Sequence, residues 1–464
     1  MNDNITATEL FDRIAQTARQ ADTSQAAKTL HDVLVLACTH GLRGSHHAFG
    51  SLMAQVDRLC RDQHLRAADQ VAIHKMRRDS NRTSEPLHPD AVAADCRALA
   101  LFVSAVFGEG IPHTLSSLLP HSTNTPQQAT EAYWPSIRCV IQAFDNDTLT
   151  VTVDNDLTPL PLVINYANTP SYRDFTYLRR IFREGMQLNL IRCTVKEGTA
   201  TPQMIVVEPD FLIDISTLAA CFKDYGHHAL NYLVRRMMPS ANSQAILLGN
   251  FAGDVLDAII NSKQFDFNET LRTHFCQKAL EYATCTDTNL PALKQAMNLQ
   301  VENIKGMVDE LFQQFNREKA ILEPSFVCEQ LGVQGRVDLM TSDLRLLVEQ
   351  KSGKNIFIER DFNNEHGGRH IESHYVQVLL YYAVLQQNFG RQNDTRIHLM
   401  YSKYERERGL LEMKPLQALV EEAIKLRNQV VATEFFIARQ GFDTLLPSLT
   451  PETIVTQNHD SYIV

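Results

Sequence analysis

The spacing of apolar residues changes twice along the chain, and these changes constrain the fold more than any single motif. From about Thr6 to Leu119 apolar residues recur every three or four positions, as between Leu30 and Leu34, which is typical of helices with one buried face. After a proline-containing polar stretch at 121–128, short apolar runs separated by Asp/Asn turns indicate strands. From Asp210 onward helical and strand patterns alternate. A chain of 464 residues is too long to fold around a single hydrophobic core. We therefore expect an α/β multidomain protein.

We expect residues 1–125 to form an N-terminal helical accessory domain and residues 126–209 a small β-barrel. The strand-like runs of the second segment, with a helical stretch from Thr176 to Arg183 between the third and fourth, cover residues 137–144, 149–153, 160–164, 187–195 and 203–207. This order fits an OB-like barrel, and a small β-domain of another kind is the alternative. Residues 210–464 then form an α/β domain with a helical insertion at about 262–320.

Charge, cysteine and hydropathy patterns narrow the class of protein. The formal net charge of -10 does not indicate a nucleic-acid-binding protein, although a basic groove can lie on an acidic one. The segment from Arg173 to Lys196 contains six basic and only two acidic residues, so it carries a local positive charge. The nine cysteines include no Cys-x-x-Cys pair, which favours reduced, mostly buried thiols. The apolar run from Ala98 to Phe107 is too short to cross a bilayer, so we expect a cytoplasmic protein without membrane contact.

Two carboxylates and a lysine form the most informative motif. Asp338 ends the stretch Gly335-Arg336-Val337-Asp338, and after ten further residues Glu349 and Lys351 flank Gln350. Because side chains alternate along a strand, Glu349 and Lys351 share one face. Converging carboxylates, with the Gln350 carbonyl as a third oxygen, could bind Mg²⁺ or Mn²⁺. Lys351 could orient a metal-bound water or offset developing negative charge.

A second group of polar residues lies on a predicted helix from about Ile371 to Gln387. His374, Gln377 and Tyr381 are spaced i, i+3 and i+7, which places them on one helix face. His374 either contacts a phosphate group or caps the start of this helix. Upstream, Glu323 lies at a predicted strand start and is a further candidate metal ligand.

These motifs resemble the core of RecB-like PD-(D/E)XK nucleases, in particular the flap-processing nuclease-helicases and their bacterial relatives. The resemblance covers about residues 135–440. It implies a restriction-endonuclease-like core preceded by an OB-like barrel. It also implies that Asp338 and Glu349 bind metal, that Lys351 serves catalysis, and that Gln377 and Tyr381 support the site or the DNA.

Basic residues near these motifs are candidate DNA contacts. Arg336 lies within the Asp338 motif, and Arg179 and Arg180 lie in the basic stretch of the predicted barrel. With His374 they complete the set of residues that we expect to contact DNA.

The sequence departs from the family pattern at two places. Relatives carry a histidine where Gly253 lies, and the adjacent Asp254 is a candidate substitute ligand. Relatives often hold an iron-sulfur cluster through one cysteine near the position of Cys221 and three beyond the catalytic core. No cysteine follows Cys328, so no cluster of that kind is expected. The sequence also contains no Gly-x-x-x-x-Gly-Lys-Ser/Thr phosphate loop, so a helicase motor would lie on a partner chain or beyond residue 464.

The sequence thus predicts a divalent-metal-dependent deoxyribonuclease. It would hydrolyse phosphodiester bonds in single-stranded or flap DNA during replication or repair, together with a helicase. A catalytically silent DNA-binding scaffold of a repair complex is the alternative, motivated by Gly253 and by the acidic net charge. A nuclease of CRISPR adaptation or phage defence would share the chemistry and differ in biological setting.

Overall fold

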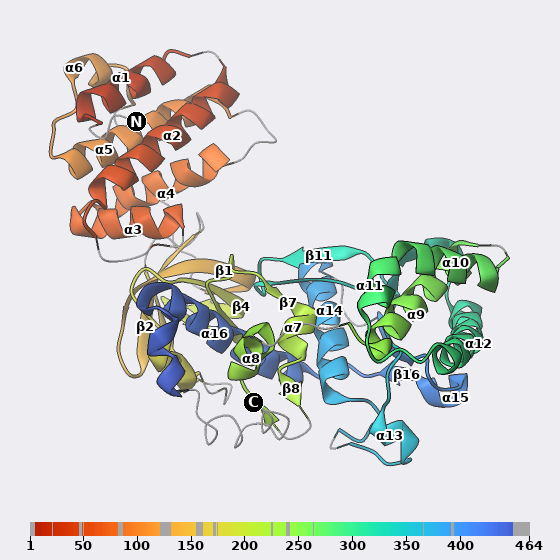
Figure 1. The fold of residues 1–464 in the computed structure, drawn as a ribbon. Coiled ribbons are helices and arrows are strands. Elements are labelled where there is room, and N and C mark those ends of the chain that lie inside the picture. Colours follow the sequence, from red (N-terminus) through yellow and green to blue (C-terminus); the bar gives the residue numbers. More distant parts are fainter. Residues whose placement is uncertain are drawn as a thin grey trace. The chain divides into compact units, whose positions relative to one another are not determined.

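The chain is an α/β multidomain protein that divides into two compact units, Met1–Pro209 and Asp210–Val464 (Figure 1). The computed structural model describes residues 5–448 except positions 21, 46–48, 50, 82–86, 121–130, 155–160, 170–172, 174, 224–225, 238–241, 263, 365 and 391–393. The boundary expected between residues 125 and 126 lies outside the described residues. The helical segment and the β-rich segment belong to one unit, whereas the sequence suggested two separate domains.

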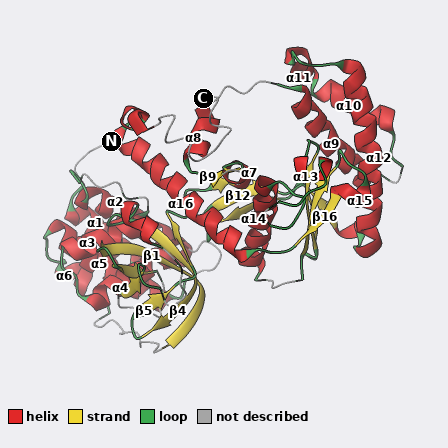
Figure 2. Cartoon of the chain, turned by 90° about the horizontal axis from the view of Figure 1, so that it is seen from below, coloured by secondary structure: helices red, strands yellow, loops and turns green. Residues whose placement is uncertain are grey.

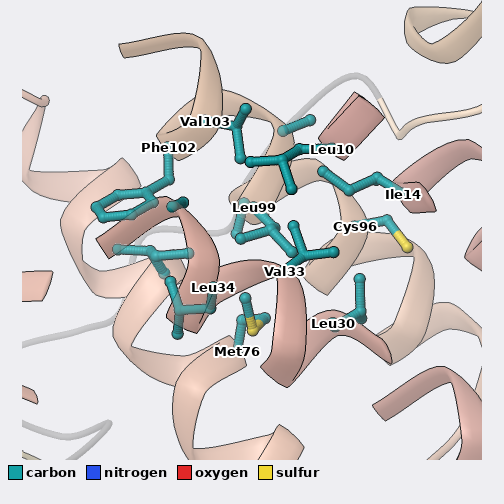
Figure 3. Packing of buried hydrophobic residues seen from close by; sticks show 14 of the residues in the cluster. Leu10, Ile14, Leu30, Val33, Leu34, Met76, Cys96, Leu99, Phe102 and Val103 are labelled. Atoms are coloured by element: carbon teal, nitrogen blue, oxygen red, sulfur yellow. The ribbon is translucent and has the colours of Figure 1, made fainter. Parts of the chain in front are cut away.

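The first unit begins with the helices α1 (Ala7–Thr17), α2 (Thr23–Gly41), α3 (Leu52–Asp62), α4 (Ala67–Asn81), α5 (Pro89–Phe107) and α6 (His113–Ser116). Helix α1 starts with a capping box, because the side chains and backbones of Thr6 and Glu9 bond reciprocally. The predicted apolar stripe is buried: Leu30 and Leu34 of α2 pack in one core with Phe102 of α5 (Figure 3). The helical character predicted for this segment is therefore confirmed.

The β-rich segment forms a closed barrel. Its elements are β1 (Glu131–Phe144), β2 (Thr148–Val153), β3 (Leu162–Asn165), the 3-10 helix η1 (Thr176–Arg180), β4 (Gln187–Lys196), β5 (Thr199–Thr201) and β6 (Met204–Val207). The strands follow the order β1-β2-β3-β5-β4, and β4 pairs back onto β1. This last pairing closes a ring of five strands.

Strands β5 and β6 both pair with β4 and are two parts of one interrupted strand. Thr201 and Met204 pair with β4 in the same antiparallel register, and Pro202 separates them. Proline lacks the N–H that the ladder requires, so the strand is interrupted there. The run predicted at 203–207 is thus only the second part of this strand. The missed part, β5, closes the barrel through the pairing of Thr199 with Val163.

Charged contacts join the helices and the barrel within the first unit. Arg78 Nη1 lies 3.0 Å from Asp154 Oδ1, and Arg77 binds the same carboxylate. Arg61 Nη1 donates to the Gln142 carbonyl at 3.1 Å. These contacts explain why the two segments form one compact unit.

The second unit is built around a five-stranded sheet with the order β10 (Ala320–Leu322), β13 (Leu339–Thr341), β14 (Leu346–Lys351), β15 (Arg396–Tyr401) and β16 (Leu410–Met413). Strands β14 and β15 are parallel, and the other neighbours are antiparallel. Helices α9 (Gln244–Asn261) and α12 (Leu290–Gln314) pack on one face through a cluster that includes Leu339 and Val348. Helix α14 (Glu372–Phe389) lies on the other face (Figure 2).

Smaller elements complete the second unit. Strands β7 (Ile213–Asp214), β11 (Ser325–Cys328) and β12 (Val333–Arg336) form a second sheet in the order β11-β12-β7. The predicted insertion contains α10 (Phe267–Gln277), α11 (Ala279–Thr284) and all of α12. The remaining elements are α7 (Ile215–Ala219), β8 (Phe222–Lys223), β9 (Gly226–His227), α8 (Leu230–Met237), η2 (Arg317–Lys319), α13 (Ile356–Glu359), α15 (Arg406–Gly409), α16 (Gln417–Gln440), η3 (Phe442–Thr444) and η4 (Leu446–Ser448). None of the described helices combines the length and apolar character needed to cross a membrane.

Candidate active site

Asp338 lies where the chain passes from one sheet to the other. The stretch from Gly335 to Met340 is divided between β12, which ends at Arg336, and β13, which begins at Leu339. Pairing of β13 with β14 ends at Leu339, and beyond it the Asp338 Oδ2 accepts a hydrogen bond from the Gln350 backbone N–H at 2.6 Å. A side chain thus replaces the missing backbone partner. Since the N–H and C=O of a strand residue point to the same edge, the Gln350 carbonyl also faces Asp338.

Glu349 and Lys351 share the face of β14 that α14 covers, as their alternation predicted. Lys351 Nζ donates to Glu349 Oε1 and to Gln377 Oε1, both at 2.9 Å. Gln377 Nε2 donates to the same Glu349 oxygen at 2.6 Å. The three side chains therefore hold one another in a fixed arrangement.

The Glu349 carboxylate is buried, with 3% of the residue exposed. Its Oε2 has no hydrogen-bond partner among the described residues. Burial, together with the charge of Asp338, raises the pKa of Glu349 from 4.5 to about 8. Burial likewise raises the pKa of Asp338. Two adjacent carboxylates that resist ionisation are typical of a functional site.

Helix α14 supplies the other predicted polar residues of this region. Tyr381 is 2% exposed and its hydroxyl donates to the Arg336 carbonyl at 2.7 Å, which ties α14 to β12. His374 Nδ1 lies 3.1 Å from the Tyr401 hydroxyl. Burial, followed by the charge of Lys351, lowers the pKa of His374 to about 3, so its ring is neutral near pH 7.

His374 does not cap α14. The N-cap residue is Ile371, and no side-chain hydrogen bond caps the helix. Of the two roles considered from the sequence, the capping role is therefore wrong. A phosphate contact would have to come from a neutral imidazole that donates a hydrogen bond, because a ring with a pKa of about 3 is uncharged.

Glu323 and Arg336 form an exposed ion pair beside Asp338. Arg336 Nη1 lies 3.0 Å from Glu323 Oε2, and the Glu323 backbone N–H donates to the Asp338 carbonyl at 3.1 Å. Glu323 has a φ of 48°, a left-handed conformation that is uncommon for residues other than glycine. The chain thus brings this carboxylate next to Asp338.

Asp254 has another partner. His274, fully buried in α10, places its Nδ1 2.6 Å from Asp254 Oδ2, and its Nε2 lies 2.9 Å from the Tyr282 hydroxyl. The structure therefore directs Asp254 toward the helical insertion. At Gly253 an added Cβ would meet no atom within 4 Å, so the space beside this residue is open.

Asp257, one turn after Asp254, was not singled out from the sequence. Burial, and then the charges of Glu323, Asp254 and Asp338, raises its pKa to about 6, so it belongs to the same electrostatic environment. The Asp254-x-x-Asp257 spacing places both residues on one helix face. This spacing is the pattern in the sequence from which Asp257 could have been identified.

The residues around Asp338 fit a hard cation by their chemistry. Among the described residues no three His, Cys, Asp or Glu side chains form a preformed metal-binding group. Mg²⁺ needs only one or two carboxylates, since it keeps several waters. The buried Glu349 Oε2 lacks a hydrogen-bond partner among the described residues, and leaving such an oxygen unpaired is costly. Asp338, Glu349 and the Gln350 carbonyl thus supply suitable oxygen ligands.

The remaining predicted residues lie in the first unit or outside the site. Arg179 Nε donates to the Asn146 carbonyl at 2.6 Å, and Arg180 is exposed on η1. The nine cysteines are free thiols, mostly buried, and the Cys221 thiol donates to the Thr217 carbonyl at 3.5 Å.

Comparison with known proteins gave no match. No protein-family model matches this chain, and no curated protein matches it.

Proposed function

We propose that the second unit is a divalent-metal-dependent deoxyribonuclease with a PD-(D/E)XK core. The observation that carries this proposal is the arrangement at the end of β14. There Lys351 binds both Glu349 and Gln377, while the Asp338 carboxylate lies across the adjacent edge. The topology agrees with such a core, since α14 lies between the parallel strands β14 and β15 in sequence.

In this proposal Asp338, Glu349 and the Gln350 carbonyl hold Mg²⁺ or Mn²⁺. When bound, the cation polarises the scissile phosphate and lowers the pKa of a coordinated water. Lys351 donates to Glu349 Oε1, so Glu349 would hold the cation through Oε2, which has no hydrogen-bond partner among the described residues. Lys351 orients the attacking water and offsets the negative charge that develops on the phosphate. Gln377 holds both side chains in place.

The substrate we propose is single-stranded or flap DNA, processed during replication or repair beside a helicase. The five-stranded ring of the first unit has the closed form of an OB-like barrel. Arg179 and Arg180 are exposed on η1 between β3 and β4 and can contact phosphates. The helicase would be supplied by another chain or by residues beyond 464.

The test is a cleavage assay with labelled single-stranded and flap DNA in Mg²⁺, Mn²⁺ or EDTA. We expect metal-dependent cleavage that Asp338→Asn abolishes and that Lys351→Ala reduces by roughly two to four orders of magnitude. Lys294→Ala, which removes an exposed lysine of α12, is the matched control and should cleave normally. Equal cleavage by all variants would identify a contaminant and remove support for the proposal.

A catalytically silent DNA-binding scaffold remains the second candidate function. Two observations favour it: Gly253 leaves open the position where relatives carry a histidine, and no preformed group of three metal ligands exists among the described residues. DNA binding by wild type and by Asp338→Asn without cleavage in either metal would favour the scaffold over the nuclease.

A further inference from the structure

Two buried amide side chains interrupt the apolar face of helix α12. Gln300 and Asn303 are 1% and 6% exposed, and they lie three positions apart among buried apolar residues such as Met297 and Ile304. Burying an amide in an apolar core is costly unless the amide makes hydrogen bonds. The bonds that these two side chains make therefore show what their polarity contributes.

Both amides donate to backbone carbonyls just beyond the ends of the parallel strands β14 and β15. Gln300 Nε2 donates to the Ser352 carbonyl at 3.2 Å, and Asn303 Nδ2 donates to the Ser402 carbonyl at 2.9 Å. Ser352 and Ser402 are the first residues after these two strands. Helix α12 thus holds the chain where the regular strand pairing ends.

Ser402 connects these contacts to Lys351, the last residue of β14. The Ser402 backbone N–H donates to the Lys351 carbonyl at 2.9 Å, and Ser402 Oγ accepts from Gln350 Nε2 at 3.4 Å. Ser402 itself is fully buried. Asn303 therefore acts on Lys351 through Ser402, and Gln300 acts on it through the next residue of the chain.

The position of Lys351 at a strand end makes this support necessary. Strand ends open more readily than strand centres. On the side of the sheet that α14 covers, Lys351 Nζ donates to Glu349 and Gln377, which fixes the tip of the side chain. The bonds from α12, on the opposite side, fix the backbone from which this side chain extends.

We propose that Gln300 and Asn303 are positioning residues of the nuclease, which hold the end of β14 so that Lys351 faces the substrate phosphate. This inference rests on the proposed function, because it concerns the same site. It gives the helical insertion a part in the reaction, through side chains that are themselves buried. A reacting group displaced by about 1 Å can lower a rate by about a hundredfold.

The test uses Gln300→Met and Asn303→Leu, which remove the amides and keep a similar volume. Gln295→Met and Asn298→Leu make the same changes at exposed positions of α12 and are the matched controls. Cleavage of labelled single-stranded DNA is measured in Mg²⁺ over a range of DNA concentrations, well below each melting temperature. We expect kcat to fall by about tenfold to a hundredfold in both amide variants, with KM unchanged, and both controls to match wild type.

Hydrogen exchange gives a second readout that does not depend on cleavage. Mass spectrometry of the peptides that contain Ser352 and Ser402 should show exchange about tenfold faster in the amide variants, because the Ser402 N–H is bonded to the Lys351 carbonyl. Exchange in the barrel strands of the first unit should stay at the wild-type rate.

The two readouts separate a positioning role from general stabilisation. A lower melting temperature with unchanged kcat would show that the amides stabilise the fold without positioning Lys351, and would overturn the inference. Unchanged exchange in both peptides would overturn it too. Either result leaves the proposed function intact, provided that wild type cleaves DNA. If wild type does not cleave DNA in either metal, the proposed function fails and this inference fails with it.

Discussion

Replacing Glu349 by glutamine should change how the stability of the metal-free protein depends on pH. The native pKa of this buried group is about 8, against 4.5 for an ordinary glutamate. Between these values the native chain holds a proton that the unfolded chain releases. Stability is therefore fully present below pH 4.5 and is lost as the pH rises toward 8.

The size of the effect follows from this difference in bound protons. One extra proton in the native state changes the free energy of unfolding by about 1.4 kcal/mol per pH unit. From pH 5.5 to 7.5 wild type should lose about 2 kcal/mol relative to Glu349→Gln, which cannot titrate. The slope should fall below this limit near pH 7.5, because the native carboxyl begins to ionise as the pH approaches its pKa of about 8.

The assay is urea unfolding in EDTA, followed by circular dichroism at pH 5.5, 6.5 and 7.5. The single tryptophan, Trp134, lies in β1 of the first unit, so its fluorescence reports a transition that Glu349→Gln should leave unchanged. Saturating Mg²⁺ should flatten the wild-type slope, since a bound cation favours the ionised carboxylate. Parallel pH profiles for wild type and Glu349→Gln in EDTA would refute the reasoning.

Three further substitutions test other features of the second unit. Tyr381→Phe removes a buried hydrogen bond to the Arg336 carbonyl and should lower the free energy of unfolding by roughly 1 to 1.5 kcal/mol; an unchanged urea midpoint would contradict this. Gly253→Ala places a methyl group in open space inside α9 and should stabilise by about 0.5–1 kcal/mol; a lower melting temperature would argue against that space. His274→Leu leaves Asp254 without its buried partner and should speed hydrogen exchange in α9 and α10, whereas unchanged exchange would show that this contact contributes little.

Local patterns predicted much of the fold from the sequence. The alternation along β14 correctly placed Glu349 and Lys351 on one face and Gln350 on the other, because side-chain direction on a strand is fixed by geometry. Helical spacing in the first segment correctly predicted a buried core. Such features depend on residues close in sequence, so a single chain reveals them.

Features that depend on distant residues were not predictable in this way. The switch between sheets at Asp338 requires the Gln350 N–H as its partner, twelve residues later. The pairing of Asp254 with His274 requires the insertion to fold back on α9. Likewise β5 is only three residues long, too short for a periodicity signal, and it becomes a strand because β3 and β4 flank it.

The bond between the Asp338 carboxylate and the Gln350 amide gives one side chain two duties, since it also belongs to the proposed cation site. A single inactive variant at this position would therefore confound architecture with chemistry. Asparagine retains an oxygen acceptor for the amide, whereas alanine leaves that amide bare. Hydrogen exchange at the Gln350 backbone amide and DNA cleavage should therefore be measured for both replacements. Activity lost with unchanged exchange would come from the missing ligand, whereas activity lost together with faster exchange would come from the disordered end of β14.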